Sequence, residues 1–314
     1  MQNILFIGGA GFIGSNLIKT ILKKSSDYHI HVLEPDLAGI GRLEGLDIEI
    51  HKGSLKNLDY IQSIIISNDI QIVVHLVSTM IPNSSYEDYQ REFENVIFPT
   101  IKLVKFCGEK HVKFIYFSSG GTIYGNKKDQ TSFEEKDDLS PISYYGLSKQ
   151  ILENCILFES RITNCDYLIL RPSNPFGSGQ NLNGNQGLIA VAIGKILTGQ
   201  TVSVFGNGNS VRDYIYIDDL SNIFLQLLEK GVSHYILNIG MGIGYSINDV
   251  IDILKRTVHE DFEVKYEASR KVDVSSVILS NEKLMSLINY KFTSIEEGIS
   301  LFYAEVKNNN LCNK

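Results

Sequence analysis

Tyr145 and Lys149 are the side chains whose types and spacing most directly suggest chemistry. They lie four residues apart, so a helix would place both on one face. A tyrosine phenol has an ordinary pKa of about 10, too high for a base at neutral pH. A nearby ammonium group and an oxidised nicotinamide ring would both lower that pKa. The pair predicts a general base that takes the proton of a secondary alcohol while a hydride leaves for NAD.

A third catalytic group is expected to be a hydroxyl that holds the alcohol oxygen. Segment 118–125, Ser-Ser-Gly-Gly-Thr-Ile-Tyr-Gly, follows an apolar run and offers Ser118, Ser119 and Thr122. Serine and glycine are also common in ordinary turns, so a purely structural role is the alternative interpretation.

A glycine-rich segment near the start of the chain predicts the position of that cofactor. It follows one apolar run and opens an amphipathic one, as a dinucleotide-binding turn does. Gly8 permits the tight turn, Gly11 lets the backbone approach a pyrophosphate, and Gly14 lets the helix pack on the sheet. The helix N-terminus, which includes Phe12 and Ile13, would offer amides and a partial positive charge to the phosphates.

Glu34 ends the second apolar run, about 20 residues after the glycines. A carboxylate there would accept hydrogen bonds from the adenosine ribose and repel a 2′-phosphate, which predicts NAD rather than NADP. Asp36 is the alternative, because Pro35 could redirect the loop between the two acids.

Apolar runs alternate with amphipathic stretches over the first half of the chain, which predicts βαβ units and a parallel sheet covered on both faces. We therefore expect a doubly wound α/β Rossmann fold. The expected strands are Asn3–Ile7, His31–Glu34, Ile72–Leu76, Phe114–Phe117 and Tyr167–Leu170. The expected helices are Ile13–Lys24, Leu58–Ser67, Asn95–Gly108 and Tyr145–Glu159.

The pattern changes after Arg171, where Gly, Asn and Gln dominate residues 173–187. We expect residues 1–172 to form the NAD-binding domain, with 211–240 returning to it. Residues 173–210 and 241–314 would form a smaller substrate-binding lobe, and the polar tail 307–314 is expected to fray. Within this half, apolar runs fall at 215–228, 235–239 and 262–266, and helices are expected at 247–257 and 281–288.

The bulk composition excludes several other classes of protein. The net charge of −7 gives no basis for nucleic-acid binding. No apolar stretch reaches the roughly 18 residues of a membrane span, and residues 1–7 are too short for a signal-peptide core. Four cysteines lie far apart without a CxxC pair, and His29 and His31 look like an ordinary pair on one strand. We expect a cytoplasmic protein with reduced cysteines and no metal.

With these residues in view, the chain resembles the extended short-chain dehydrogenases, and within them the NAD-dependent sugar epimerase/dehydratase family. Its motifs are most like those of UDP-glucose 4-epimerases. The resemblance runs almost end to end, through GGAGFIGS, SSGGTIYG, YYGLSK, LRPSNPFG, VFGNGNSVRDYIYIDD and the late segment 270–273, Arg-Lys-Val-Asp. It implies a nucleotide-sugar substrate and a homodimer that pairs through the helices expected at 95–108 and 145–159.

The resemblance also implies roles for particular residues. Asn174 and Arg212 would contact the nucleotide diphosphate, and Arg270 and Asp273 would lie near the diphosphate and ribose. Arginine suits this role because it pairs with phosphate oxygens in a bidentate, permanently charged contact. Phe205 would line the base. The remaining implied substrate contacts are Gln186, Gly187, Leu188, Val204 and Val277, besides Thr122.

On the cofactor side, the resemblance implies that Asn95 orients the catalytic strand and loop. Structural salt bridges or core packing are the alternatives for all these residues. The further implied cofactor contacts are Ser54, Leu55, Leu76, Val77, Ser78, Ser118, Pro172, Asn174 and Pro175, besides Tyr145 and Lys149.

Three positions depart from the family pattern. The usual catalytic Ser or Thr, 25 residues before the tyrosine, is Gly120 here, so we expect Thr122 to supply the hydroxyl, with Ser119 second. Ser54 replaces an Asp that usually recognises adenine. Gly120 and Gly121 replace the acids of the 4,6-dehydratases, which argues against dehydration.

The resemblance therefore implies 4-epimerisation of a UDP-hexose through a transient 4-keto sugar. A reductase of a nucleotide-linked 4-keto-6-deoxy sugar is the alternative, although Glu34 argues against the NADPH such enzymes use. A non-catalytic NAD-binding regulator is a third interpretation, which the intact Tyr145 and Lys149 disfavour. Val277 would leave room for an N-acetyl group on the sugar.

Overall fold

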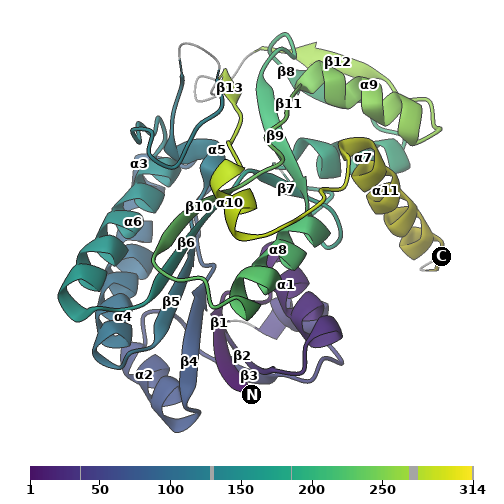
Figure 1. Ribbon diagram of the computed structural model, residues 1–314. Helices are drawn as coiled ribbons and strands as arrows, with labels where there is room; N and C mark the ends of the chain where they lie inside the picture. Colours follow the sequence, from purple (N-terminus) through teal and green to yellow (C-terminus); the bar gives the residue numbers. More distant parts are fainter. Residues whose placement is uncertain (36, 128–130, 185, 269–274, 313–314) are drawn as a thin grey trace.

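A seven-stranded parallel sheet forms the centre of the protein (Figure 1). The computed structural model describes residues 1–35, 37–127, 131–184, 186–268 and 275–312. The sheet strands are β1 (Gln2–Ile7), β2 (Tyr28–Glu34), β3 (Glu49–Lys52), β4 (Ile70–His75), β5 (Lys113–Phe117), β6 (Tyr167–Pro172) and β10 (Tyr235–Ile239). Their order, β10-β6-β5-β4-β1-β2-β3, reverses direction at β1 and β4 and confirms the doubly wound Rossmann fold.

Helices cover both faces of this sheet (Figure 1). Helices α1 (Phe12–Lys24) and α8 (Ile217–Glu229) pack together over the face that carries Ile4 and Phe6 of β1. Leu5 and Ile7 point to the opposite face. The helices over that face are α2 (Leu58–Ser67), α4 (Phe98–Glu109) and α6 (Tyr144–Thr163). Burial on both sides explains why the strands are almost continuously apolar.

All five predicted strands of the first half are present, with ends shifted by up to three residues. Strand β3 was missed because only Ile50 in its four residues is apolar, as suits an edge strand. The helix expected at 95–108 is also different. Its segment contains α3 (Tyr86–Glu92), a π-helical stretch Phe93–Ile97, and α4. A capping box between Ser85 and Asp88 starts α3.

The second half builds smaller sheets above the carboxyl ends of the main strands (Figure 1). Strand β9 (Val211–Tyr216) pairs with β7 (Asn174–Phe176), β11 (Gly244–Ser246) and β13 (Ser276–Val277), and β8 (Val202–Phe205) pairs with β12 (Val264–Glu267). The segment expected to return to the main domain therefore rejoins it at α8, since β9 belongs to the small sheet. The short helices are α5 (Gly120–Ile123), α10 (Glu282–Leu287) and a 3₁₀ segment, Leu37–Leu43.

Three longer helices complete this half: α7 (Leu188–Leu197), α9 (Ile247–Thr257) and α11 (Ile295–Cys312). The expectation that residues 307–314 fray is wrong as far as Cys312, because α11 continues to that residue. Ile295, Ile299 and Phe302 are buried at helical spacing, and α11 docks on α9 with this face. Among the described helices, none is both long and apolar enough to cross a membrane.

A buried ion pair fastens α6 to the main sheet. Arg171 on β6 donates to Glu153 on α6 through Nε at 3.0 Å and Nη2 at 2.6 Å, and both side chains are at most 2% exposed. Arg171 Nη1 also donates to the Tyr124 hydroxyl at 2.7 Å, which in turn donates to Asn238 on β10 at 2.7 Å. This network links the helix that carries Tyr145 and Lys149 to two strands and to the loop after β5.

We expect Glu153→Ala to lower the free energy of unfolding by about 3–5 kcal/mol, because it leaves the Arg171 charge buried without its carboxylate. Denaturant-induced unfolding followed by circular dichroism measures the change. Glu134→Ala is the control, since its ion pair with Lys136 is exposed and should contribute no more than about 1 kcal/mol. Equal effects of the two substitutions would contradict this role for the buried pair.

Candidate active site

The glycine turn after β1 has the geometry expected of a dinucleotide cradle. Gly8 has a φ of +83°, which favours glycine. A Cβ on Gly14 would lie 2.6–2.9 Å from backbone atoms of Gly9, so the helix packs closely against the turn. A Cβ on Gly11 would meet only the Gly8 carbonyl oxygen, at 3.5 Å. The protein itself therefore leaves space at Gly11, as an approaching pyrophosphate requires. Phe12 and Ile13 begin α1 directly beside this space.

Glu34 lies against the same turn. Its Oε1 accepts a hydrogen bond from the Ala10 N–H at 2.7 Å. Burial raises the pKa of this carboxyl, and the Ala10 hydrogen bond opposes the shift. The carboxylate is thus held at the carboxyl end of β2, where a ribose would lie. The alternative acid, Asp36, lies outside the described residues.

Most of the other predicted cofactor residues follow the carboxyl ends of neighbouring strands. Ser54 and Leu55 follow β3, and Ser118 follows β5. Within the described chain, the Ser118 Oγ is buried and has no hydrogen-bond partner. This unpaired hydroxyl and the open glycine turn fit a bound dinucleotide. Leu76, Val77 and Ser78 follow β4, and Pro172, Asn174 and Pro175 lie at the end of β6 and in β7.

Asn95 does not take the orienting position that the resemblance implied. It lies half-buried in the π-helical stretch, and no side-chain hydrogen bond joins it to a described residue. Glu92, 2% exposed, makes the expected kind of contact instead. It accepts hydrogen bonds from Ser78 Oγ at 2.9 Å and from the Thr79 N–H at 3.0 Å. The sequence gave no sign of this role, because both chain neighbours of Glu92 are exposed.

Tyr145 and Lys149 occupy the first two turns of α6, as predicted. Ser143 caps this helix by accepting a hydrogen bond from the Gly146 N–H. The Lys149 ammonium is buried, donates to the Phe117 carbonyl at 3.1 Å, and lies 5.5 Å from the centre of the Tyr145 ring. Burial lowers the pKa of Lys149 to about 8, although the charge of Glu92 opposes the shift.

Burial raises the pKa of Tyr145 to about 12, against a hydrogen bond with Ser119 that lowers it. The predicted lowering by Lys149 is therefore not seen in the protein alone, where that ammonium group is directed at the Phe117 carbonyl. Thr122 Oγ1 donates to Ser119 Oγ at 2.9 Å. These contacts favour Ser119 over Thr122 as the hydroxyl beside the phenol, the reverse of the preference drawn from the sequence.

The structure explains the glycine at position 120. A Cβ there would lie 2.4 Å from Leu279 Cδ1 and 2.9 Å from the Arg171 carbonyl oxygen. No side chain fits without moving the backbone or repacking Leu279. The usual hydroxyl of the family is sterically excluded from this position.

A cavity of about 400 Å³ lies between α7, β8 and β9. Its apolar walls and few polar groups are typical of a small-molecule site. It adjoins the catalytic loop, since a Cβ on Gly121 would be 3.6 Å from Asn174 Oδ1. Of the predicted substrate residues, it brings together Asn174, Gln186, Gly187, Leu188, Val204, Phe205 and Arg212.

Other predicted substrate residues lie elsewhere. Val277 is 2% exposed and packs among Ile123, Tyr124 and Leu279, and neither Val277 nor Thr122 lines the cavity. Val277 therefore offers no surface to a sugar in this arrangement, because it faces the apolar cluster. Arg270 and Asp273 lie outside the described residues.

Lys195 is a cavity residue that the sequence did not indicate. It lines the wall from α7 and donates to Ser203 Oγ at 3.2 Å. Its only sequence signal was a single cation in the apolar stretch 188–197, which an exposed lysine would give equally well. With Arg212, it gives the cavity two cations suited to an anionic ligand.

Comparisons with known proteins agree with this geometry. A model of the NAD-dependent epimerase/dehydratase family matches residues 4–240. A putative UDP-glucose 4-epimerase of Methanocaldococcus jannaschii is 30% identical, over 98% of this chain and 99% of its own. A dTDP-4-dehydro-6-deoxyglucose reductase of Escherichia coli is 28% identical, over 98% of each chain.

A solved structure shows the same arrangement of the whole chain. The UDP-glucose 4-epimerase of Thermotoga maritima, crystallised with UDP-glucose, superposes with a TM-score of 0.91 and 29% identity, covering 98% of this chain and 100% of its own. The glycine turn, Glu34 and the Tyr145–Lys149 helix lie within the segment that the family model matches. The chain belongs to the NAD-dependent epimerase/dehydratase family, and its cofactor is NAD.

Proposed function

We propose that this protein catalyses the NAD-dependent 4-epimerisation of a UDP-hexose, such as UDP-glucose and UDP-galactose, through a transient 4-keto sugar. The observation that carries the proposal is the placement of Tyr145, Ser119 and Lys149 beside the glycine turn and next to a cavity that contains Arg212. The UDP-glucose 4-epimerases among the similar proteins support the same reaction.

Tyr145 takes the proton of the C4 hydroxyl, and Ser119 holds the same oxygen through a hydrogen bond. When bound, the oxidised nicotinamide supplies the hydride acceptor and a positive charge beside the phenol. Lys149 stabilises the phenolate by its charge. Arg212 and Asn174 hold the diphosphate while the keto sugar turns over in the cavity. Tyr145 then returns its proton to the C4 oxygen as the hydride returns to the opposite face, so no net oxidation occurs.

A second candidate is the reduction of a nucleotide-linked 4-keto-6-deoxy sugar. The Escherichia coli reductase supports it, because that relative spans the whole chain at 28% identity. The Glu34 carboxylate opposes it in the form that uses NADPH, since its charge would repel a 2′-phosphate. The two reactions differ in stoichiometry, because a reductase consumes one reduced cofactor per sugar and an epimerase consumes none.

The homodimer implied by the resemblance is a proposal supported by exposed apolar side chains on α4 and α6. Phe98 is 50% exposed on α4, and Phe158 and Ile162 are 51% and 64% exposed on α6. Such side chains in contact on neighbouring helices are typical of an interface. Light scattering on the purified protein should give the mass of two chains, and the mass of one chain would contradict the proposal.

The purified protein, without added cofactor, is expected to convert UDP-galactose into UDP-glucose, seen by NMR of the anomeric proton. Tyr145→Phe should reduce the rate by about 10²–10⁴-fold, because the phenylalanine cannot take the C4 proton. UDP-N-acetylgalactosamine, assayed in parallel, tests whether N-acetyl forms are accepted.

Full activity of Tyr145→Phe would exclude Tyr145 as the base. No conversion of any UDP-hexose, together with oxidation of added NADH or NADPH by a 4-keto-6-deoxy sugar nucleotide, would replace epimerisation by the reductase reaction. Tyr144→Phe is the matched control, because Tyr144 is 39% exposed and stacks on Tyr89 rather than facing the glycine turn.

Ser119→Ala should reduce kcat by about 10²-fold or more, since it removes a hydrogen bond to the reacting oxygen. Thr122→Val should cost about tenfold or less, because Thr122 acts through its hydrogen bond to Ser119. Steady-state kinetics of the two variants makes the comparison. A larger loss from Thr122→Val would restore Thr122 as the primary hydroxyl.

A further inference from the structure

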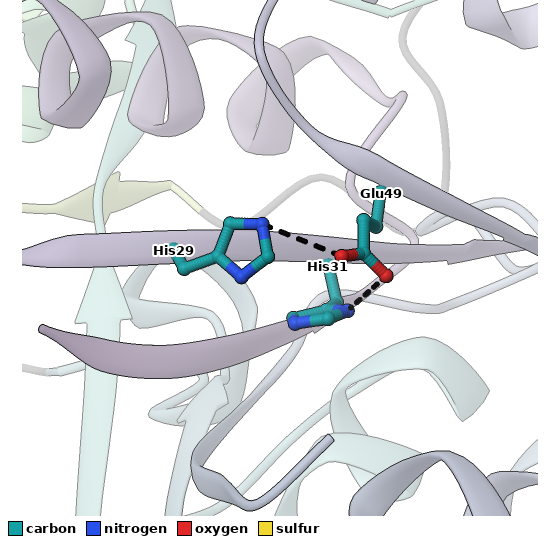
Figure 2. Close-up of side chains that lie close together, drawn as sticks. All are labelled: His29, His31 and Glu49. Carbon is teal, nitrogen blue, oxygen red and sulfur yellow. Dashed lines mark ion pairs between the residues drawn. The ribbon is translucent and has the colours of Figure 1, made fainter. Parts of the chain in front are cut away.

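Three histidines and a glutamate gather on one face at the edge of the main sheet. His29 and His31 lie on β2, and Glu49 and His51 lie on the edge strand β3. His31 is paired with Glu49 in the parallel register, and His51 is two residues further along β3. Side chains two residues apart on a strand share a face, so all four point to the same side. We name this group the edge histidine cluster; Figure 2 shows three of its members.

The ligating atoms of the cluster converge. Glu49 bridges the two histidines of β2, with Oε1 3.5 Å from His29 Nε2 and Oε2 3.4 Å from His31 Nδ1 (Figure 2). His51 Nε2 is 3.1 Å from His31 Nδ1. Zinc with ligands at about 2.05 Å gives a tetrahedron whose edges are about 3.3 Å. The separations between these atoms match such edges without any change of strand register.

The protonation state of the cluster also suits a cation. His31 is 1% exposed, and burial lowers the pKa values of both His31 and His51. Neutral imidazoles are the form that binds metals. His31 Nε2 is buried without a partner among the described residues, so this ring interacts with polar groups through Nδ1 alone. There it faces both a nitrogen and a carboxylate, two acceptors that one cation can satisfy together.

We propose that the edge histidine cluster binds one Zn²⁺ ion, with His29 Nε2, His31 Nδ1 and a Glu49 oxygen as ligands and His51 Nε2 as the fourth. Imidazole nitrogen with a single carboxylate favours zinc over magnesium or calcium, which prefer sites built of oxygen. The ion would join β3 to β2 and so fix the edge strand. This site is separate from the catalytic groups on α6.

The sequence did not predict this site, although it showed the pair His29 and His31. The cluster needs Glu49 and His51, which lie on a strand that the sequence did not reveal. Only the register between β2 and β3 brings the two pairs together. The expectation of no metal rested on the first pair alone.

Titration of the full-length, tag-free protein with Co²⁺ and then Zn²⁺ tests the proposal. We expect one equivalent of Co²⁺ to bind with the visible absorption of a tetrahedral site, and Zn²⁺ to displace it. The unfolding temperature should rise with Zn²⁺ concentration, because the ion binds only the folded arrangement of strands. Mg²⁺ should cause neither change.

The double variant His29→Gln/Glu49→Gln should weaken Zn²⁺ binding by about 100-fold or more, beyond the roughly 10–100-fold that loss of an outer partner costs. Both side chains are at least one third exposed, so the core is not disturbed. His234→Gln is the matched control, because His234 pairs with Asp166 at 2.7 Å as a single exposed imidazole. It should bind Zn²⁺ like the unmodified protein.

Absence of saturable Co²⁺ or Zn²⁺ binding would overturn the proposal, and so would unchanged binding by the double variant. If the double variant fails to fold, His51→Gln gives the same decision, since His51 is the proposed fourth ligand. None of these measurements depends on sugar turnover. Failure of the zinc site therefore leaves the proposed epimerisation untouched, and the reverse also holds.

Discussion

The contact between Arg171 and Glu153 is the interaction on which the catalytic arrangement depends. Two buried charges must remain together, because separating them leaves each in a medium of low dielectric constant. Since Arg171 belongs to β6 and Glu153 to α6, this requirement fixes the position of the helix on the sheet. Tyr145 and Lys149 are carried by the same helix, one and two turns before Glu153. The hydrogen bond from Arg171 to Tyr124 extends the constraint to the loop that presents Ser119.

Burial acts on the two catalytic side chains in opposite directions. It lowers the pKa of Lys149 and raises that of Tyr145, and in both cases it favours the neutral form. Glu92 adds negative charge, which favours the ammonium form of Lys149 but opposes the phenolate of Tyr145. The protein alone therefore does not create a strong base. A positive charge from the cofactor supplies the missing stabilisation, which links activation of the base to occupancy of the dinucleotide site.

Features that depend on local spacing could be predicted from the sequence. The glycine turn, the acid at the end of β2, the Tyr145–Lys149 pair and most strands of the main sheet are of this kind, because turn geometry and strand patterns are set by near neighbours. Most of the cavity lining followed from the family resemblance. Strand β3, the burial of Glu92 and the position of Lys195 could not be predicted, because each depends on what packs against the residue. The preference between Ser119 and Thr122 failed for the same reason, since it depends on which hydroxyl reaches Tyr145.

The crowding around Gly120 has an evolutionary consequence. The leucine side chain at position 279 fills the volume that a hydroxyl-bearing residue would need, so the two positions are no longer independent. Restoring the ancestral kind of residue at 120 would require a smaller side chain at 279 first. The glycine is entrenched by its neighbour, and the order of past substitutions constrains which sequences this lineage can still reach. Recombining motifs from relatives one position at a time would therefore cross a non-functional intermediate here, whereas exchanging both positions together would not.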